Sequence, residues 1–265
     1  LASQGGRGGA NSIELYQYLE SLKLNPAVVG KNGETALHGI ARRDKQSEII
    51  KYFISKGVDI NKADNEGYTA FMNAAATNRD LAAIELLASI VKDINQKNNS
   101  GISALALAVR GNSPEVVAAL VARGAEVNVF DANGDNLAYY LLQSYSIQND
   151  AAFDTKFRML QDKGLNPASP QMNGNTLYHL AVAKNDLGLL KRVALLNIDI
   201  NAKNKEGYSA LHKAAMSAKD ERIIKYLLEI GAKKDAKTEF DETAYDLAGE
   251  NESLLKNKIS IDFLK

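Results

Sequence analysis

The sequence predicts an all-α solenoid, in which one unit of two short helices is repeated along the chain. Residues 206–237 show the unit most clearly, as EGYSALHKAAMSAKDERIIKYLLEIGAKKDAK. Leu211, Ala214 and Ala215 fall at i, i+3 and i+4, which places them on one face of a first helix. The apolar pairs in IIKYLL mark a face of a second helix, and Gly231 can end it because glycine tolerates positive φ.

The unit needs copies as neighbours, because two helices of about ten residues cannot bury their apolar faces on each other alone. The turn glycine that opens the unit recurs at steps of 34, 34, 33, 40, 33 and 34 residues. A fixed period of this length indicates one supersecondary unit stacked many times. Aspartate takes the glycine position in the last copy, and the full set is Gly33, Gly67, Gly101, Gly134, Gly174, Gly207 and Asp241.

Short motifs recur at fixed places in these copies. They are the G-x-T-x-L-H string of Gly33, Thr35, Leu37 and His38, the alanine pairs Ala74-Ala75 and Ala214-Ala215, and the Gly-Ala pairs Gly124-Ala125 and Gly231-Ala232. In these motifs the chain resembles the ankyrin repeat along nearly its whole length. The resemblance implies stacked helix-turn-helix units joined by short β-hairpin fingers.

The chain departs from the ankyrin pattern in two ways. The family's proline after threonine is replaced by alanine or leucine throughout. The copy that opens at Gly134 has Asn136, Ala138 and Tyr139 where threonine, leucine and histidine belong. These differences weaken single copies and leave the array intact.

We therefore expect a single domain over residues 1–265. It comprises a partial repeat at 1–30, repeats at 31–63, 64–97, 98–130, 131–170, 171–203 and 204–237, and a closing half-repeat at 238–265. The second helix of the closing half-repeat is short and polar, as a terminal repeat requires to stay in solution. Helix pairs should begin near Leu37, Ala70, Ala104, Leu137, Leu177, Ala210 and Ala244.

The opening residues resemble the second half of a repeat. Leu15, Tyr18, Leu19 and Leu22 form a helical stripe, and no turn motif precedes them. Tyr18 shares its repeat position with Tyr52 and Tyr226, and all three should pack beside the apolar stripe. The GGRGG segment is expected to be an enlarged loop between helices, because a phosphate-binding loop needs a different string and a preceding strand. We expect the chain to be cut from a longer repeat protein.

The repeat at 131–170 carries an insertion of about seven residues near 146–154, before a second helix that contains Phe157 and Leu160. Insertions in solenoids often lie on the binding face. A tolerated surface insertion is the other interpretation, because lengthening a loop costs little entropy. The sequence favours neither.

Composition excludes several classes of function. The formal net charge is zero, which gives no electrostatic case for nucleic acid or acidic membranes as partners. No apolar run approaches the roughly 18 residues of a membrane helix, so we expect no membrane insertion. The chain has no cysteine, which excludes disulfides, thiolate metal sites and a cysteine nucleophile. We expect a soluble monomer, in a compartment that the sequence does not assign.

The three histidines, His38, His179 and His212, occupy one repeat position, five residues after the turn glycine. The resemblance implies that each is structural and bonds a nearby hydroxyl and a loop backbone. The hydroxyl partners would be Thr35, Thr176 and Ser209. Equivalent residues in adjacent repeats lie about 10 Å apart, too far to share a metal at bonds of about 2 Å. We therefore expect no metal, no cofactor, no catalytic residue and no enzymatic activity.

Four apolar residues lie on the predicted fingers. Tyr68, Ile102 and Tyr208 each follow a turn glycine, and Phe130 lies on a finger flank four residues before Gly134. Apolar side chains exposed at such positions are candidate partner contacts. The alternative is local packing against the next finger, since single exposed apolar residues are normal.

These observations predict a non-catalytic module that binds another protein through the concave face of fingers and first helices. One alternative is an architectural spacer within a longer protein. Another is a targeting module for a catalytic domain outside this chain. A contiguous apolar patch on the fingers would favour binding, whereas a uniformly polar face would favour the spacer.

Overall fold

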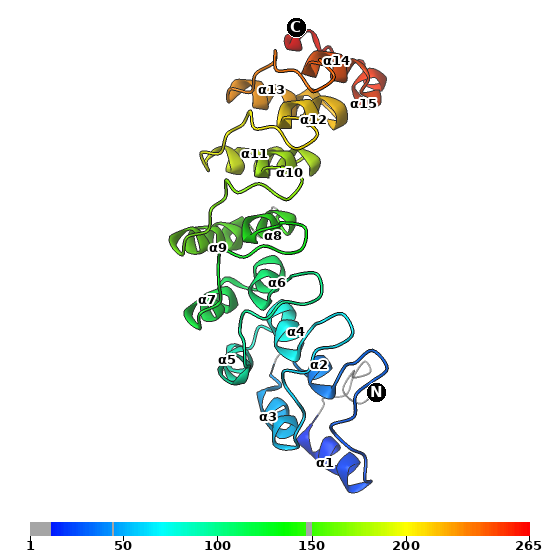
Figure 1. Cartoon of the computed structure of the whole chain (residues 1–265), viewed down its shortest axis with the longest axis vertical. Helices are drawn as coiled ribbons and strands as arrows, with labels where there is room; N and C mark the ends of the chain where they lie inside the picture. Colours follow the sequence, from blue (N-terminus) through cyan, green and yellow to red (C-terminus); the bar gives the residue numbers. More distant parts are fainter. Residues whose placement is uncertain (1–11, 44, 147–149) are drawn as a thin grey trace. The chain divides into compact units, whose positions relative to one another are not determined.

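The computed structural model of the chain describes residues 12–43, 45–146 and 150–265 (Figure 1). Within these ranges the regular structure is helical, from α1 to α15, with a short 3-10 helix at Asp262–Leu264. The chain divides into two compact units. Unit 1 comprises residues up to Ala132 together with Ser146–Gly164, and unit 2 comprises Asn133–Tyr145 and Leu165–Lys265.

Unit 1 consists of two layers of helices. The first helices of its repeats, α2, α4 and α6, pack on one another in order, and so do the second helices α1, α3, α5, α7 and α9. Contacts within α2–α3, α4–α5 and α6–α7 join the layers. The bounds are α1 Ile13–Ser21, α2 Ala36–Ile40, α3 Ser47–Ser55, α4 Ala70–Thr77, α5 Leu81–Ile90, α6 Ala104–Gly111, α7 Pro114–Ala122 and α9 Asp150–Asp162.

Unit 2 repeats the same arrangement. Its first helices α8, α10, α12 and α14 pack in chain order, while α11 and α13 form the second layer and the 3-10 helix packs on α14. The repeat that opens at Gly134 thus gives α8 to unit 2 and α9 to unit 1. The bounds are α8 Leu137–Gln143, α10 Leu177–Ala183, α11 Leu187–Ala194, α12 Ala210–Ser217, α13 Glu221–Glu229, α14 Ala244–Gly249 and α15 Glu252–Lys256.

The predicted starts of the first helices are confirmed, with α2 beginning one residue early at Ala36. A serine or threonine directly precedes most of these helices as the N-cap residue. The side chains of Thr69, Ser103 and Ser209 each accept a hydrogen bond from a backbone N–H of the first turn. Asn136 replaces this residue in the irregular repeat. Its Oδ1 accepts from the N–H groups of Ala138 and Tyr139, so the departure from the family pattern preserves the cap.

The predicted fingers are present as tight hairpins. Single antiparallel bridges close three of them, at Ala63–Thr69, Lys97–Ser103 and Lys237–Thr243. In the first of these, the N–H of Gly67 donates to the carbonyl of Asp64 at 3.0 Å, and the Asp64 carboxylate accepts from two further N–H groups of the turn. Aspartate at the first position and glycine at the fourth therefore act as expected for this turn.

The predicted buried face of α1 is wrong. Tyr16 is the buried residue of α1, and its ring meets Phe53 of α3 edge-on with centroids 4.8 Å apart. Tyr18 is 61% exposed, and Leu15 and Leu22 are exposed as well. Helix α1 packs on α3, so the face turned toward α3 is buried. The expected GGRGG loop lies outside the described residues.

The predicted insertion is partly helical. Residues 147–149 lie outside the described part of the chain, but from Asp150 onward the segment belongs to α9. Phe153 stacks on Phe157 with centroids 5.9 Å apart, and both rings are buried. Residues 150–154 therefore extend the second helix toward its N-terminus and add core to unit 1.

Candidate partner-binding surface

The finger tips within each unit are joined by backbone hydrogen bonds. In unit 1, the N–H groups of Asn65, Asn99 and Ala132 each donate to a carbonyl of the preceding finger, at 2.9, 3.1 and 3.0 Å. In unit 2, the N–H groups of Met172 and Lys205 make the same bond at 3.2 and 2.9 Å. These bonds join the fingers of unit 1, and those of unit 2 as far as the finger at Gly207, into a row that we call the finger ladder.

The three histidines at the shared repeat position connect the first helices to the fingers. In His179, Nδ1 accepts from the backbone N–H of Thr176 at 3.1 Å, so Nε2 carries the proton and donates to the carbonyl of Tyr208 at 2.9 Å. His38 makes the same pair of bonds with Thr35 and with the carbonyl of Tyr68, both at 3.0 Å. His212 differs, because its Nε2 reaches the carbonyl of Ala236.

In the irregular repeat, Tyr139 connects the first helix to the next finger in place of a histidine. It occupies the histidine position, it is fully buried, and its hydroxyl donates to the carbonyl of Asn175. Asn175 follows a turn glycine, as Tyr208 does, so the two acceptors are equivalent. Burial raises the pKa of the Tyr139 hydroxyl, which therefore remains a donor.

The four candidate contact residues lie on both units. Tyr68 and Ile102 are half-buried on adjacent fingers of unit 1, whose ladder continues through Phe130, which is 43% exposed. Tyr208 is half-buried in unit 2, where its ring meets His212 edge-on and the ammonium of Lys213 at 4.4 Å from its centroid.

A hollow of about 410 Å³ lies beside Tyr68. The fingers contribute Glu34, Asp64 and Glu66 to it, the turn after α2 contributes Arg42, and α4 contributes Asn73. Arg42 donates to the amide oxygen of Asn73 at 3.1 Å. Tyr68 is thus an aromatic edge of a polar hollow in unit 1.

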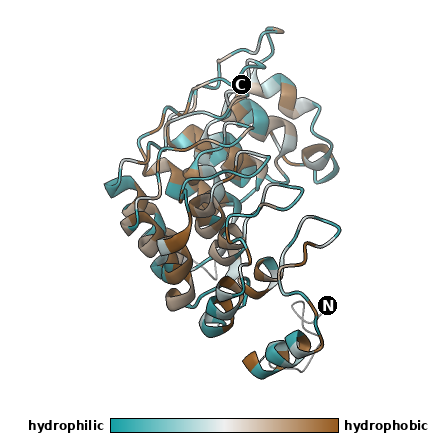
Figure 2. Ribbon diagram, turned by 60° about the horizontal axis from the view of Figure 1, so that its bottom comes forward, coloured by the Kyte–Doolittle hydropathy of each residue, from teal (hydrophilic) through white to brown (hydrophobic). Residues whose placement is uncertain are grey.

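Two exposed apolar finger residues escaped the sequence analysis. Met172 is 61% exposed and Phe240 is 74% exposed, and both lie in unit 2. Phe240 directly precedes the turn residue Asp241, whereas the predicted contacts Tyr68, Ile102 and Tyr208 directly follow their turn glycines. Elsewhere the fingers are largely hydrophilic, as the teal loops of Figure 2 show. The exposed apolar side chains of the fingers are therefore separate anchors in a polar surround.

The comparison with known families identifies the repeats. The family model described as ankyrin repeats in three copies matches residues 8–98, 40–131 and 132–238, which together cover most of the chain. The chain is an ankyrin-repeat protein. Ankyrin repeats generally serve as protein–protein interaction modules, and the family is generally non-catalytic.

One relative of this ankyrin-repeat protein is the human transient receptor potential cation channel subfamily A member 1. The two are 28% identical over 183 residues, which is 69% of the present chain. The matched segment is 13% of that relative's length, so the chain spans a small part of the protein that it matches.

Within its described ranges, this ankyrin-repeat protein has neither a cluster of metal-ligand side chains nor a helix that could span a membrane. No group of three or more His, Cys, Asp or Glu side chains lies close enough to hold a metal ion. In the same part of the chain, no helix has the length and hydrophobicity to cross a bilayer, and α9, for example, has 13 residues.

Acidification is expected to destabilise unit 2 of this ankyrin-repeat protein, because His179 and His212 are buried. Burial lowers the pKa of both imidazoles, although their bonds to backbone carbonyls oppose the change. In the unfolded chain histidine titrates near about 6.5. Below that pH the unfolded state binds more protons, and stability falls by up to about 1.4 kcal/mol per pH unit for each histidine until the lower folded pKa values are passed.

Urea unfolding between pH 5 and 8 measures this effect. The midpoint should be constant near pH 8 and fall below about pH 6.5. The double variant His179→Gln and His212→Gln should be less stable at pH 8 and should lose much of the pH dependence. An equal slope in the wild type and the double variant would contradict the assignment.

Proposed function

We propose that this chain is a non-catalytic interaction module that binds a partner protein through the face formed by its fingers and first helices. The finger ladder is the observation that carries the proposal. Its backbone bonds hold successive fingers in register, so their outward side chains can differ without disturbing the helices beneath. Such a rigid row binds with little loss of conformational entropy.

The hollow beside Tyr68 supports a partner that inserts an apolar side chain into the finger face. An apolar partner side chain that packs on Tyr68 would be flanked by the carboxylates of Glu34 and Glu66. Phe130 adds a second apolar anchor on the same unit. Buried area would therefore supply most of the affinity, because the chain as a whole is neutral. Nucleic acid is not proposed as a partner, and the chain is proposed to act as a monomer.

The three histidines are proposed to support this face rather than to contact the partner. His38 and His179 fix the carbonyls that directly follow the turn glycines, and they are themselves buried. Catalysis by these side chains is not proposed, because their ring nitrogens are already engaged by backbone groups.

Truncation of the two anchors tests the proposal. Tyr68→Ala and Phe130→Ala should each weaken partner binding by about 1–3 kcal/mol if they are anchors. Stability should change little, because His38 bonds the backbone carbonyl of residue 68, which alanine retains. The partner is first obtained by affinity capture with the whole chain and is then titrated at low and high salt.

Leu195→Ala is the matched control. Leu195 is 84% exposed and follows a second-layer helix, so its truncation removes a similar apolar side chain outside the finger face. Unchanged affinity in both anchor variants would place the interface elsewhere. So would an affinity that collapses with salt, because buried apolar contacts are only weakly screened.

A further inference from the structure

In unit 2, the finger at Gly207 holds a lysine side chain of the chain itself. The ammonium of Lys213 lies 4.4 Å from the centroid of the Tyr208 ring and 2.9 Å from Oε2 of Glu206. The face of an aromatic ring attracts a cation, and the carboxylate pairs with it. The bond to Lys213 lowers the pKa of the Glu206 carboxyl, so the carboxylate form is favoured. This finger therefore shows which side chain its Glu-Gly-Tyr turn binds.

Unit 1 has the same Glu-Gly-Tyr turn at residues 66–68. In each turn, the N–H groups of the glutamate and the tyrosine donate to one side-chain oxygen, which belongs to Asp64 in unit 1 (2.9 and 2.8 Å) and to Asn204 in unit 2 (3.1 and 3.0 Å). A histidine Nε2 bonds the tyrosine carbonyl in both units. The glycine φ values, 84° and 78°, also agree. The two backbones therefore hold the glutamate and tyrosine side chains in equivalent positions.

The lysine of unit 2 has no counterpart in unit 1. Asn73 occupies the position equivalent to Lys213, and its buried side chain bonds the carbonyl of His38. Among the cation–ring contacts and ion pairs of the described ranges, none involves Tyr68 or Glu66. The turn in unit 1 thus has the ring and the carboxylate of a lysine site, while the lysine itself is replaced by asparagine.

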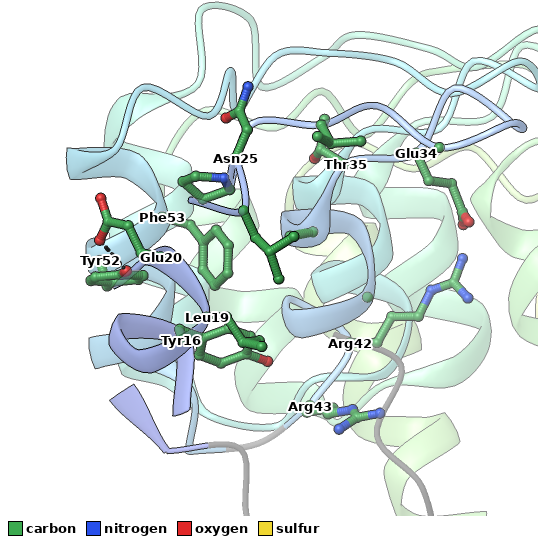
Figure 3. Close-up of a pocket in the computed structure, with 16 residues that line it drawn as sticks. Tyr16, Leu19, Glu20, Asn25, Glu34, Thr35, Arg42, Arg43, Tyr52 and Phe53 are labelled. Carbon is green, nitrogen blue, oxygen red and sulfur yellow. Dashed lines mark hydrogen bonds between the residues drawn. The ribbon is translucent and has the colours of Figure 1, made fainter. Parts of the chain in front are cut away.

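The hollow beside this turn carries an excess of negative charge. Glu34 adds a carboxylate from the preceding finger, and Figure 3 shows Glu34 and Arg42 on the same side of α2. Together with Asp64 and Glu66, three carboxylates and one guanidinium line the hollow. Arg42 already donates to an asparagine of α4. In unit 2 the position of Glu34 holds the uncharged Asn175, so the hollow in unit 1 is the more acidic of the two settings.

A lysine side chain suits both the ring and the carboxylates. Its four-carbon stem is apolar and can pack along the Tyr68 ring while the charged end remains in a polar setting. The ammonium can then meet Glu66 and Glu34, and the ring face adds cation–π attraction. The stem of a lysine therefore supplies the apolar packing expected on Tyr68, and its ammonium accounts for the carboxylates around it.

We propose that the hollow beside Tyr68 receives a lysine side chain of the partner protein. Its ammonium lies between the Tyr68 ring and the Glu66 carboxylate, as the ammonium of Lys213 does in the equivalent turn of unit 2. The assignment of this lysine to a partner rests on the proposed function, which it makes more specific. One exposed ion pair contributes little, so high salt should weaken binding by no more than about fivefold.

Two small probes test the hollow on the whole chain. The first is Nα-acetyl-lysine methylamide. The second is Nα-acetyl-norleucine methylamide, which keeps the four-carbon chain and lacks the ammonium. Magnetic resonance of the isotope-labelled protein, at constant ionic strength, follows the amides of residues 66–68. We expect the lysine probe to shift these amides saturably at millimolar concentrations, and the norleucine probe to bind at least about threefold more weakly.

Two variants separate the charge from the ring. Glu66→Gln removes the carboxylate, and Tyr68→Leu replaces the ring by an aliphatic side chain, so each should weaken the lysine probe by at least about threefold. The melting temperature should change little, because the turn is held by backbone N–H groups that both variants keep. Glu85→Gln is the matched control. It removes an exposed carboxylate from α5, outside the fingers, and should bind the probe like the wild type.

Lys213→Asn tests the comparison between the two turns. It gives unit 2 the asparagine that unit 1 has at this position. The lysine probe should cause no saturable shift at residues 206–208 of the wild type, because Lys213 already meets the ring and the carboxylate. The variant should gain saturable shifts there, with little change in melting temperature, since an exposed ion pair adds little stability. No gain at residues 206–208 would overturn the proposal.

Three further results would overturn it. The first is equal binding of the two probes at residues 66–68, or no saturable shift up to about 50 mM lysine probe. The second is wild-type affinity for the lysine probe in Glu66→Gln. The third is a titration of the captured partner in which Tyr68→Ala weakens binding while Tyr68→Leu and Glu66→Gln do not, because an apolar anchor would explain that contact. Unchanged partner affinity in both Tyr68→Ala and Phe130→Ala would instead overturn the proposed function, because the probe experiment requires no partner.

Discussion

Gly67→Ala is expected to destabilise unit 1 by about 2–4 kcal/mol, as the sum of backbone strain and overpacking. Gly67 has a φ of 84°, which is unfavourable for alanine. A Cβ at this position would lie 2.6 Å from the backbone nitrogen of Asn99 on the next finger. Asn99 donates to the carbonyl of Glu66 at 3.1 Å, so relieving the clash would break a bond of the finger ladder.

Gly57→Ala separates the two causes. Gly57 has a similar φ of 79°, but a Cβ there would meet nothing within 4 Å. Its substitution should cost about 1 kcal/mol, the strain alone. Urea unfolding of the wild type and both variants measures the difference. Equal losses in the two variants would mean that the close approach between fingers contributes nothing.

Asp241 illustrates the same distinction in the natural sequence. It occupies the turn position of the last finger and has a φ of 66°. Aspartate tolerates this region better than most residues that carry a Cβ. The sequence spacing placed Asp241 among the turn glycines, and the structure agrees with that placement.

The helices could be predicted because their signal is local. Apolar residues at helical spacing, a hydroxyl residue before each first helix and glycine in each turn recur with the period. The buried face of α1 was mispredicted because the spacing of apolar residues does not specify which side of a helix packs on the neighbouring helix. The equivalent position holds a half-buried tyrosine in α3 and the exposed Tyr18 in α1.

Contacts between repeats were less accessible to sequence analysis. In the sequence, Tyr139 stands where the repeat pattern has histidine. Its hydroxyl nevertheless bonds the carbonyl of Asn175, which is equivalent to the Tyr208 carbonyl that His179 bonds in the next repeat. The finger ladder also escaped, because it is made by backbone groups that carry no sequence signature. Such contacts depend on how one repeat lies on the next, which the period alone does not specify.

The role of three asparagines that bridge successive repeats could not be predicted from the sequence for the same reason. The amide groups of Asn78, Asn112 and Asn251 each donate to two carbonyls at the end of the preceding first helix. Those carbonyls lie where intrahelical donors run out. In unit 1, the buried ammonium of Lys156 reaches an equivalent carbonyl, that of Val109, at 3.0 Å. Lysine and asparagine side chains thus both supply donors to the carbonyls at the end of a first helix, although no sequence motif relates the two residues.

Asn112→Ala is expected to cost about 2–4 kcal/mol, because it leaves buried carbonyls without donors. Asn112 is 5% exposed, and its amide nitrogen donates to the carbonyls of Ala75 and Asn78 at 3.0 and 2.8 Å. Its Oδ1 also accepts from the N–H of Ser113. Alanine removes all three bonds and fills none of the space.

Asn257→Ala is the matched control for this prediction, measured by urea unfolding. Asn257 makes one long bond of 3.4 Å to the carbonyl of Lys219 in an exposed setting, so its loss should stay within about 0.5 kcal/mol. Water can replace the amide of Asn257, whereas the carbonyls beneath Asn112 are shielded by α4 and α6. A loss as small at Asn112 as at Asn257 would show that water also reaches the carbonyls at the end of α4, and that the Asn112 amide adds little to the contact between repeats α4–α5 and α6–α7.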